Sequence, residues 1–462
     1  MSRRRPLVAV VLAAGKGTRM RSRLPKVLHP VGGRPLLAWV LEAARDAGCR
    51  RILVVVGHGA EEVRAALPAR DVVWVEQREQ RGTGHALLRV APHVAGSARL
   101  LVLSGDVPLV RAATLRRLVR AAARAWGAMA WTAMDDPGSL GRVVAAPGGT
   151  LERIVEAADA SPEEAALRRV NAGLYVLPAP EIFAYLRRLR PDNAKRELYL
   201  TDALGAAAAA GRPVRLVELE DPREALGVND RRELALVHLR LLGAKAAALQ
   251  EAGVTLCDPG RTVVEPQVEV GEDTVLHPGV CLLGRTRVGR GCVLHQGAWL
   301  RDTQVADGAT IEPYCVLDGA TVGPGCRVGP YARLRPGAVL AAGARVGNFV
   351  EVKNARLGEG AKANHLAYLG DATVGARVNY GAGSITANYD GANKHRTVIE
   401  DDVQIGSDVQ LVAPVTVGKG ATIGAGATIT KDAPPGELTF TKKEQVTKPG
   451  WKRPVKKASS EQ

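Results

Sequence analysis

The C-terminal half of the sequence places an aliphatic residue at every sixth position. One series runs without a slip through Ile399, Ile405, Leu411, Val417, Ile423 and Ile429. An α-helix repeats near 3.6 residues and a plain strand near 2, so neither element explains this period. Three hexads, each a short strand and a turn, form one triangular coil with the aliphatic residues inside. The period therefore predicts a parallel β-helix.

The same period occurs earlier in the chain, at Val288, Leu294 and Leu300 and at Val322, Val328, Leu334, Leu340, Val346 and Val352. The alternative is a low-complexity tract of Gly and Val. A disordered tract would not keep its aliphatic residues in phase, so we prefer the β-helix. If each coil takes three hexads, residues 263–429 form roughly nine coils, stacked about 4.8 Å apart.

The composition of the chain agrees with more than one folded domain. A chain of 462 residues normally forms two or three domains. Hydrophobic residues make up 46% of the chain and aromatic residues only 4%, so Val, Leu and Ala must fill the interiors. No apolar run approaches the length of a membrane span, and the N-terminus does not read as a signal peptide. We expect a cytoplasmic protein.

The cysteines and the net charge point to the compartment and to the partners. Six cysteines occur singly, and we expect reduced core residues at positions 49, 257, 281, 292, 315 and 326. The net charge of +16 suggests anionic partners, although an arginine-rich composition would give the same total. Phosphorylated small molecules fit this charge. Nucleic acid ranks last, because the sequence has no basic stripe with interleaved aromatic residues.

A glycine-rich segment follows the first strand-like run, Pro6–Leu12. Backbone N–H groups in such a turn can surround a phosphate, and Gly15 and Gly17 lack the Cβ atoms that would block its approach. Arg19 and Lys26 add two cations. An ordinary turn is the alternative, but this combination after a first strand is more specific than glycines alone. The spacing matches neither the P-loop nor the dinucleotide fingerprint.

Helices and strands alternate after this loop, which predicts a mostly parallel sheet with ligands at the carboxyl ends of its strands. Asp106 follows a strand that we expect at 100–103, where a carboxylate can hold a hard cation against a phosphate. A turn or a helix cap is the alternative role for Asp106. We expect helices at 36–47 and 60–67 and further strands at 52–56 and 72–75.

A helical pattern at 231–252 connects the two halves. Asn229 and Asp230 can cap its start and Gly253 can end it. A helix of this length is about 33 Å long. We interpret it as a connecting helix.

The glycine-rich segment with Arg19 and Lys26, followed by Asp106 at a strand end, resembles the corresponding part of the sugar-nucleotide pyrophosphorylases. From Leu7 to about Lys457, the chain resembles the family of bifunctional N-acetylglucosamine-1-phosphate uridyltransferases and glucosamine-1-phosphate acetyltransferases. The resemblance implies an α/β Rossmann-like nucleotidyltransferase domain at 1–231, a helical linker at 232–252 and a left-handed parallel β-helix of hexapeptide repeats, the acetyltransferase domain, at 253–462.

The resemblance also implies two activities. The C-terminal domain would acetylate glucosamine-1-phosphate with acetyl-CoA. The N-terminal domain would transfer UMP from UTP to N-acetylglucosamine-1-phosphate, giving UDP-N-acetylglucosamine and pyrophosphate for peptidoglycan and cell-envelope synthesis. This second reaction brings two anions together, so Arg19, Lys26 and Mg²⁺ would offset their repulsion. No side-chain nucleophile is required.

The resemblance assigns site residues to the N-terminal domain. Asp106 and Asn229 would bind Mg²⁺. The nucleotide and sugar sites would comprise Leu12, Ala13, Ala14, Gly15, Lys26, Gln77, Gly82, Thr83, Ser104, Gly105, Gly141, Glu156, Asn171 and Asn229. Ser104, Arg21, Arg23, Ala158 and Arg196 differ from the residues usual in the family. These departures lie beside the site and bear on affinity rather than on reaction type.

We expect the six-residue period to be interrupted at three places, 348–353, 362–370 and 388–394. In the first of these, we expect Lys353 to lie in a turn. His365 lies in the second, close in sequence to Lys353 and Tyr368. A lone histidine is more often an ordinary surface or core residue. Acetyl transfer needs a base, however, because only the free amine attacks, and a histidine pKa near 6.5 suits that role.

The resemblance assigns the other residues of this half. Arg335, Lys353, Tyr368 and Asn379 would bind glucosamine-1-phosphate, with His365 as the base. The acetyl-CoA groove would be lined by Ala382, Asn388, Tyr389, Ser407, Ala425 and Lys442. Lys442 replaces an arginine that is common in the family. The basic segment 442–457 either joins this site or is a solvated end.

One coil offers only a shallow groove to a ligand as long as CoA. Three-fold closure suits a triangular prism, and the resemblance implies a homotrimer with acetyltransferase sites between subunits. Two other readings remain. One is a single-activity nucleotidyltransferase with a regulatory β-helix, and the other is a non-catalytic scaffold of the translation-factor type. His365 argues against the first, and the pair Asp106 and Asn229 against the second.

Overall fold

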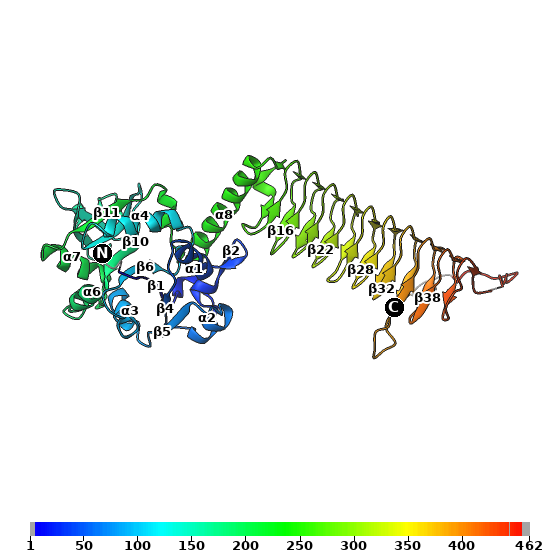
Figure 1. The fold of residues 1–462 in the computed structure, drawn as a ribbon, viewed down its shortest axis with the longest axis horizontal. Coiled ribbons are helices and arrows are strands. Elements are labelled where there is room, and N and C mark those ends of the chain that lie inside the picture. The colour runs from blue at the N-terminus through cyan, green and yellow to red at the C-terminus, as the bar shows by residue number, and fades with distance from the viewer. Residues whose placement is uncertain (1–4, 443, 455–462) are drawn as a thin grey trace, which may run out of the picture. The chain divides into compact units, whose positions relative to one another are not determined.

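The computed structural model describes residues 5–442 and 444–454. The chain forms two compact units, the first up to Ala244 and the second from Lys245. Figure 1 shows a mixed α/β arrangement for the first unit and a stack of coils for the second. Within the described residues, no helix is both long and apolar enough to cross a membrane.

The first unit is built on one twisted sheet whose central strands are parallel. β1 pairs in parallel with β4 and β6, and β4 pairs in parallel with β5. β10 is antiparallel to β6 and β7, which the sequence did not predict. The order is β11 (Val214–Glu218), β7 (Gly127–Ala133), β10 (Arg169–Pro178), β6 (Arg99–Ser104), β1 (Leu7–Ala13), β4 (Ile52–Val56) and β5 (Val72–Glu76). The hairpin β8 (Arg142–Ala145) and β9 (Leu151–Val155) pairs with β10.

Helices cover both faces of this sheet. Alternate residues of β1 point to opposite layers, so Val11 packs in one core and Val10 in the other. Because both faces are buried, the strands read as continuous apolar runs. One layer contains α1 (Leu36–Asp46), α2 (Ala60–Ala66) and α4 (Ala112–Ala122), and the other contains α3 (Thr83–Arg89), α6 (Ala179–Leu186) and α7 (Leu200–Ala209).

The second unit contains three parallel sheets whose strands succeed one another along the chain, as the hexad period predicted. The first sheet comprises β12 (Thr255–Leu256), β15 (Val275–Leu276), β18 (Val293–Leu294), β21 (Thr310–Ile311), β24 (Arg327–Val328), β27 (Arg345–Asn348), β30 (Lys362–His365), β33 (Asn379–Tyr380), β36 (Gln404–Ile405), β39 (Thr422–Ile423) and β41 (Leu438–Thr439). The second comprises β13 (Val263–Val264), β16 (Cys281–Leu283), β19 (Trp299–Arg301), β22 (Val316–Asp318), β25 (Arg333–Leu334), β28 (Glu351–Lys353), β31 (Tyr368–Gly370), β34 (Ile385–Ala387), β37 (Gln410–Val412) and β40 (Thr428–Ile429). The third comprises β14 (Glu269–Val270), β17 (Arg287–Val288), β20 (Gln304–Val305), β23 (Thr321–Val322), β26 (Val339–Leu340), β29 (Arg356–Leu357), β32 (Ala372–Val374), β35 (Thr397–Ile399) and β38 (Val415–Val417).

The hexad aliphatics fill the interior of the β-helix, as predicted. All six members of the series from Ile399 to Ile429 are buried, and none is more than 4% exposed. The three sheets hold 11, 10 and 9 strands in the described part of the chain, so the coil number is slightly above the predicted nine.

Two local predictions about the ladder were wrong. The segment 362–370 does not break it, because Lys362 pairs with Arg345 and with Asn379 in parallel register and Ala363 is fully buried. These coils are one residue shorter than three hexads, which shifts the sequence period without interrupting the strands. Lys353 is the last residue of strand β28 rather than part of a turn.

The connecting helix α8 spans Arg231–Glu251. Asp230 caps it, since its Oδ1 accepts hydrogen bonds from the backbone N–H groups of Arg232 (2.8 Å) and Glu233 (2.9 Å). Early in the helix, Val237 packs with Met20 and Val31 in the first unit. The first unit therefore includes most of this helix.

The cysteine prediction was right for most positions. Cys49, Cys292, Cys315 and Cys326 are buried, and Cys281 is half-buried. Cys257 is exposed, because it directly follows the buried Leu256 and so points outward.

Candidate active sites

The glycine-rich loop leaves the end of β1 and leads into a short 3₁₀ helix, Thr18–Met20. Gly17 has a φ of +60°, and a Cβ atom on it would lie 2.7 Å from Cβ of Lys26. Glycine at this position therefore allows Lys26 to approach the loop. Gly15 differs, because a Cβ atom there would meet nothing within 4 Å.

This contrast gives a stability prediction. We expect Gly17→Ala to lower the free energy of unfolding by about 1–2 kcal/mol, because alanine is strained in the left-handed region and would press on Lys26. Gly15→Ala is the matched control and should leave stability unchanged. Thermal unfolding of both variants checks this. Equal melting temperatures would contradict the steric role of Gly17.

A cavity of about 540 Å³ opens at the carboxyl ends of β1 and β6. It brings together ten of the residues that the sequence assigned to this site: Leu12, Ala13, Ala14, Gly15, Lys26, Gln77, Gly82, Thr83, Ser104 and Asp106. Gly17, which the sequence placed in the phosphate-binding turn, lines it too, with six residues that the sequence analysis did not assign: Lys16, Thr18, Val27, Gln80, Ala86 and Glu197. Of these, Lys16 and Thr18 stand in the glycine-rich motif itself, which was the available signal.

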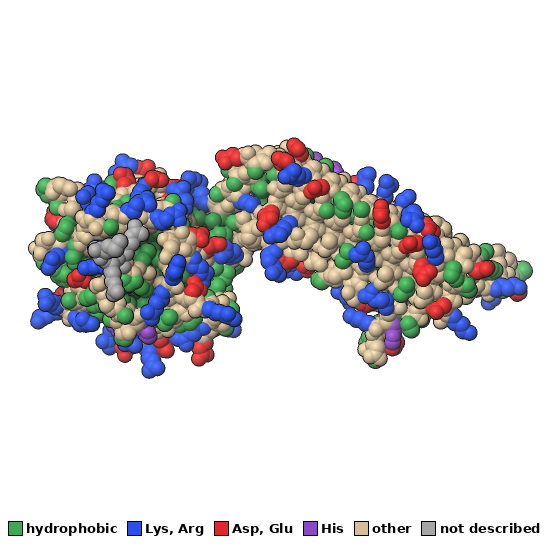
Figure 2. All heavy atoms as spheres, in the orientation of Figure 1, with side chains coloured by type: hydrophobic (Ala, Val, Ile, Leu, Met, Phe, Trp, Pro, Cys, Tyr) green, Lys and Arg blue, Asp and Glu red, His purple; other side chains and the backbone are tan. Residues whose placement is uncertain are grey.

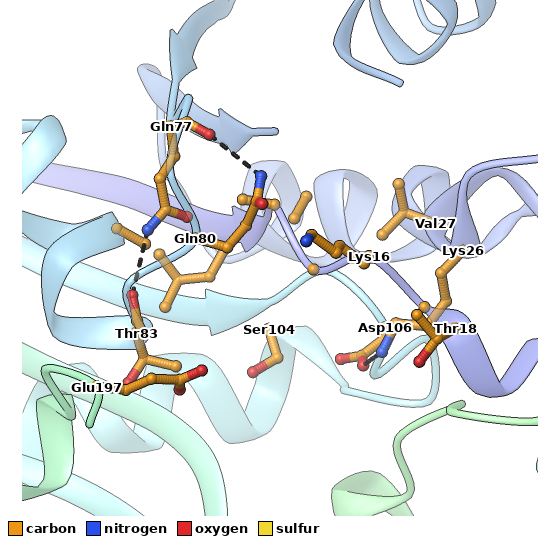
Figure 3. Close-up of a pocket in the computed structure, with 17 residues that line it drawn as sticks. Lys16, Thr18, Lys26, Val27, Gln77, Gln80, Thr83, Ser104, Asp106 and Glu197 are labelled. Carbon is orange, nitrogen blue, oxygen red and sulfur yellow. Dashed lines mark hydrogen bonds and ion pairs between the residues drawn. The ribbon is translucent and has the colours of Figure 1, made fainter. Parts of the chain in front are cut away.

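The two ends of the cavity differ in chemistry. Thr83 and Glu197 lie at one end, Lys26 and Asp106 lie at the other, and Ser104 lies between them (Figure 3). Hydrogen bonds fix the first end, because Gln77 Nε2 donates to the carbonyl of Gly82 (3.3 Å). Thr83 Oγ1 accepts a hydrogen bond from the backbone N–H of Leu200 (3.0 Å). The end with Thr83 thus offers amide and hydroxyl groups together with the Glu197 carboxylate, and the other end offers the ion pair of Lys26 and Asp106.

At the charged end, residues far apart in sequence converge. Lys26 Nζ forms an ion pair with Asp106 and donates a hydrogen bond to Asn229 Oδ1 (3.2 Å). The backbone N–H of Val228 donates to the carbonyl of Asp106 (2.9 Å), which aligns the two segments. A carboxylate and an amide oxygen therefore face one point that already holds positive charge.

This donor set fits a hard divalent cation. Mg²⁺ prefers oxygen ligands, and commonly takes one or two from protein and the rest from phosphates and water. Within residues 5–442 and 444–454, no group of three or more His, Cys, Asp or Glu side chains is arranged to hold a metal by itself. Asp106 and Asn229 would thus supply the protein ligands, and substrate oxygens would complete the site.

Six predicted residues lie outside the lining of this cavity: Gly105, Gly141, Glu156, Asn171, Asn229 and Arg19. Gly105 packs against β1, where a Cβ atom would lie 3.1 Å from Cβ of Ala13. Gly141, Glu156 and Asn171 form a neighbouring cluster, because the N–H of Asn171 donates to the carbonyl of Gly141 (2.8 Å) and a Cβ atom on Gly141 would lie 3.6 Å from the Glu156 carboxylate.

Burial raises the pKa of the Glu156 carboxyl, although Thr201 Oγ1 donates a hydrogen bond to it (2.9 Å). A Cβ atom on the adjacent Gly173 would lie 3.3 Å from Ser104 Oγ. Ser104 therefore connects this cluster to the cavity.

Two arginines near this site adopt positions that the sequence did not reveal. Arg19 is exposed and does not line the cavity. Arg196 has a φ of +52°, a left-handed conformation that favours glycine.

In the second unit, the predicted acetyltransferase residues lie along one corner of successive coils. The N–H of Asp408 donates to the carbonyl of Ala382 and the N–H of Gly426 to that of Ser407, both at 2.8 Å. The N–H of Gly383 donates to the carbonyl of Leu366 (3.1 Å). This corner row therefore comprises His365, Ala382, Ser407 and Ala425, one residue from each coil.

His365 is oriented by Asn348 of the preceding coil. Its Nδ1 lies 2.9 Å from Asn348 Oδ1, and an amide oxygen only accepts hydrogen bonds. Nδ1 is therefore the protonated nitrogen of the neutral ring, and the exposed Nε2 is free to accept a proton. This is the tautomer that a general base requires.

A cationic cluster lies on the adjacent sheet. The ammonium of Lys394 lowers the pKa of Lys353, which shows that the two cations lie close together. Arg335 donates a hydrogen bond to Glu351 Oε1 (2.8 Å). The sequence analysis did not assign Lys394 to a site, because it reaches Lys353 only through the return of its loop. Tyr368 lies on β31 of this same sheet, whereas the exposed Asn379 lies on β33 of the first sheet.

The loop that carries Lys394 is anchored at both ends. Asn388 is buried and donates to Asp371 Oδ2, and the N–H of His395 donates to the carbonyl of Asn388 (2.9 Å). The Asp390 pKa is lowered by backbone N–H groups and by His395. Tyr389 is 62% exposed at its tip.

The remaining predicted CoA residue is at the C-terminal end of the stack. Lys442 is exposed and follows Thr441, whose Oγ1 accepts a hydrogen bond from the N–H of Thr428 (3.2 Å). Residues 443 and 455–457 of the basic segment lie outside the described residues. On the visible faces in Figure 2, Lys and Arg side chains are interspersed with Asp and Glu.

Family descriptions match both halves of the chain. The MobA-like NTP transferase domain matches residues 9–205, the GMPPB C-terminal domain matches 259–358, and the bacterial transferase hexapeptide (six repeats) matches 396–431. The fold is therefore a Rossmann-like nucleotidyltransferase domain followed by a left-handed parallel β-helix of hexapeptide repeats. A putative glucose-1-phosphate thymidylyltransferase structure from Bacillus anthracis is 19% identical with a TM-score of 0.42, covering 50% of this chain and 94% of its own, which is too low to bear on function.

Full-length relatives are much closer in sequence. Bifunctional protein GlmU of Chromobacterium violaceum is 47% identical, covering 98% of this chain and 99% of its own. The proteins of the same name from Cupriavidus pinatubonensis and Burkholderia thailandensis are each 50% identical, covering 97% of this chain and 99% of their own. The chain belongs to the family of the bifunctional protein GlmU.

Proposed function

We infer that this protein is a bifunctional enzyme with uridyltransferase and acetyltransferase activities, which makes a precursor for cell-wall synthesis. Its second unit acetylates glucosamine-1-phosphate with acetyl-CoA. Its first unit transfers UMP from UTP to N-acetylglucosamine-1-phosphate, giving UDP-N-acetylglucosamine and pyrophosphate. The observation that supports this best is that one chain carries both the charged nucleotide-sized cavity and the corner row with an oriented His365.

In the first reaction, the phosphate of the sugar attacks the α-phosphorus of UTP. The N–H groups of the glycine-rich loop and the cavity lysines, Lys16 and Lys26, hold the triphosphate. The end with Gln77 and Thr83 takes the uridine, and the Glu156 cluster takes the sugar. Arg19 is exposed near this loop, where its positive charge attracts the anion.

Asp106 and Asn229 hold the divalent metal, which we propose to be Mg²⁺. When bound, this ion neutralises charge on the phosphates and on the departing pyrophosphate. The protein contributes position: the hydrogen bond from Val228 to Asp106 keeps the two ligands at one edge of the sheet.

In the second reaction, Nε2 of His365 removes a proton from the amine of glucosamine-1-phosphate, and the amine then attacks the thioester carbonyl carbon of acetyl-CoA. An amide bond forms, the C–S bond breaks, and CoA leaves as its thiol. The cations Lys353, Lys394 and Arg335 take the phosphate of the sugar. The corner row beyond His365 lines the path of CoA. Burial raises the pKa of the Cys315 and Cys326 thiols, which disfavours them as acetyl carriers and supports direct transfer.

A coupled assay tests the overall function. The protein is incubated with glucosamine-1-phosphate, acetyl-CoA and UTP, and free CoA thiol and pyrophosphate are measured. Release of both supports the assignment. Pyrophosphate release from N-acetylglucosamine-1-phosphate without any release of CoA would favour the reading in which the β-helix is only regulatory.

We also propose that the protein is a homotrimer joined through its β-helix. Four exposed apolar side chains follow one another along one corner of the coils, next to the corner row. They are Tyr314 (47% exposed), Tyr331 (50%), Phe349 (55%) and Leu366 (61%). The rings of Tyr314 and Tyr331 stack at 5.3 Å, and those of Tyr331 and Phe349 at 5.6 Å. A continuous apolar ridge is usually covered by another molecule, and a second copy here would enclose His365.

This ridge gives an assembly prediction. We expect Phe349→Asp to make the protein monomeric in sedimentation and to abolish acetyl transfer, because it places a charge in the covered ridge. Uridylyl transfer should remain. Leu239→Asp, which changes an exposed leucine of α8 (64%), is the matched control. Acetyl transfer by a fully monomeric protein would contradict the shared site.

The structure also sets the end of a useful uridyltransferase fragment. A fragment that ends near Arg231 would lose Val237, which packs against Met20 beside the glycine-rich loop. A fragment that retains α8 to Glu251 is therefore the appropriate monomeric reference.

A further inference from the structure

Lys26 lies where the two proposed metal ligands converge. Its ammonium forms an ion pair with Asp106 and a hydrogen bond with Asn229 Oδ1 (3.2 Å). The side chains of Lys26 and Asp106 are only 14% and 19% exposed, so solvent weakens their attraction less than at the surface. In Figure 3 the amine of Lys26 points at Asp106. The Lys26 ammonium therefore lies where a metal cation would contact Asp106 and Asn229.

Hydrogen bonds hold the backbone around this site in place. The N–H of Asn229 donates to Glu233 Oε2 (2.5 Å), and the N–H of Val228 donates to the carbonyl of Asp106 (2.9 Å). Lys26 begins a short 3₁₀ helix, Lys26–Leu28. The Cβ atom of Lys26 lies beside Gly17. The four-carbon stem of the lysine can nevertheless move the ammonium without moving these contacts. The two ligands and the lysine can thus separate while the fold stays the same.

A divalent cation and the ammonium cannot occupy this point together. Both need the Asp106 carboxylate, and their like charges repel at such short range. Without any cation, however, a partly buried Asp106 would be left uncompensated, which is costly. The lysine stabilises the carboxylate when no metal is bound, and the phosphates of a nucleotide offer the ammonium another partner in the same cavity.

We propose that Lys26 occupies the metal position of the nucleotide-free protein and must leave it before a divalent cation binds. The inference rests on the proposed uridyltransferase site. It implies that metal and nucleotide bind cooperatively, because each favours the arrangement in which Lys26 has turned to the phosphates. By linkage, this coupling is reciprocal.

The test is Mn²⁺ binding to the full-length protein without nucleotide, measured from the electron paramagnetic resonance signal of free Mn²⁺. Lys26→Met should bind Mn²⁺ at least about tenfold more tightly than the natural protein, a typical size for such coupling. Lys16→Met is the matched control, since Lys16 lines the same cavity, and it should bind like the natural protein. Equal affinity of Lys26→Met and the natural protein would overturn the proposal.

Two further variants make the test decisive. Lys26→Gln keeps a hydrogen-bond donor for Asp106 but removes the charge, and it should show the same gain, so the result does not depend on the folding of one variant. Adding Asp106→Asn to Lys26→Met should remove the gain. If the gain survived, the metal would bind elsewhere and the proposal would be wrong.

This readout is independent of the overall reaction. Suppose that Lys26→Met binds Mn²⁺ more tightly but the natural protein shows no uridylyl transfer. The proposed function would then fail, while the competition between lysine and metal would stand. If uridylyl transfer occurred but no variant gained Mn²⁺ affinity, the competition would fail while the function stood.

Discussion

Replacing Asp106 by alanine should abolish pyrophosphate release from UTP while acetyl transfer continues at its normal rate. Asp106 is the only charged protein ligand proposed for the metal, and charge stabilisation by a metal is worth several kcal/mol, which corresponds to roughly a thousandfold or more in rate. The ion pair with Lys26 is lost at the same time. The freed lysine can still bind phosphate, so the loss reports on the metal site.

The measurement is pyrophosphate release with N-acetylglucosamine-1-phosphate as acceptor, alongside release of CoA thiol in the acetyl reaction. Asp106→Asn should show nearly the same loss, because it keeps the shape and removes the charge. Asp46→Ala, an exposed aspartate at the end of α1, is the control and should behave normally. An equal fall of both activities in a folded Asp106→Ala protein would contradict the separation of the two sites.

Replacing His365 by alanine should produce the opposite pattern. Acetyl transfer should fall by about 10²–10⁴-fold, the usual contribution of a general base, with uridylyl transfer near normal. The loss should be smaller at higher pH. The substrate amine loses its proton as the pH rises, so a larger fraction can attack without a base.

The contact with Asn348 adds a second level to this prediction. Asn348→Ala should lower acetyl transfer by a smaller factor than His365→Ala. The substitution removes the contact that fixes the tautomer and the orientation of the His365 ring, but it leaves the base in place. His277→Ala, in an early coil of the β-helix, is the matched histidine control and should retain full activity. Unchanged acetyl transfer in His365→Ala would remove this residue from the mechanism.

The parts of the fold that depend on local pattern could be predicted from the sequence. The strand at 52–56 was predicted with the bounds that the structure shows, because both its faces are buried and its apolar run ends where burial ends. The hexad series predicted the interior of the β-helix residue by residue for the same reason. The antiparallel β10 was missed, since strand direction depends on connections and not on apolar pattern.

The candidate sites were predictable where a motif lies next to a strand end, and less so elsewhere. Asp106 follows such a signal, whereas Asn229 was assigned through the family resemblance, and the structure brings the two together. Glu197 lines the same cavity but arrives from a loop between α6 and α7, which has no recognisable motif. Lys394 likewise reaches Lys353 only because its loop is anchored by Asn388. Contacts of this kind depend on the path of the chain in three dimensions.

In the proposed function, one chain carries two separate active sites, and the acetylated sugar phosphate diffuses from one to the other. The most direct test mixes the Asp106→Ala and His365→Ala proteins with glucosamine-1-phosphate, acetyl-CoA and UTP, and measures UDP-N-acetylglucosamine. Each variant alone should form almost none. The mixture should restore its formation, because Asp106→Ala supplies the acetylated sugar phosphate that His365→Ala consumes. A mixture as inactive as either variant alone would contradict the account.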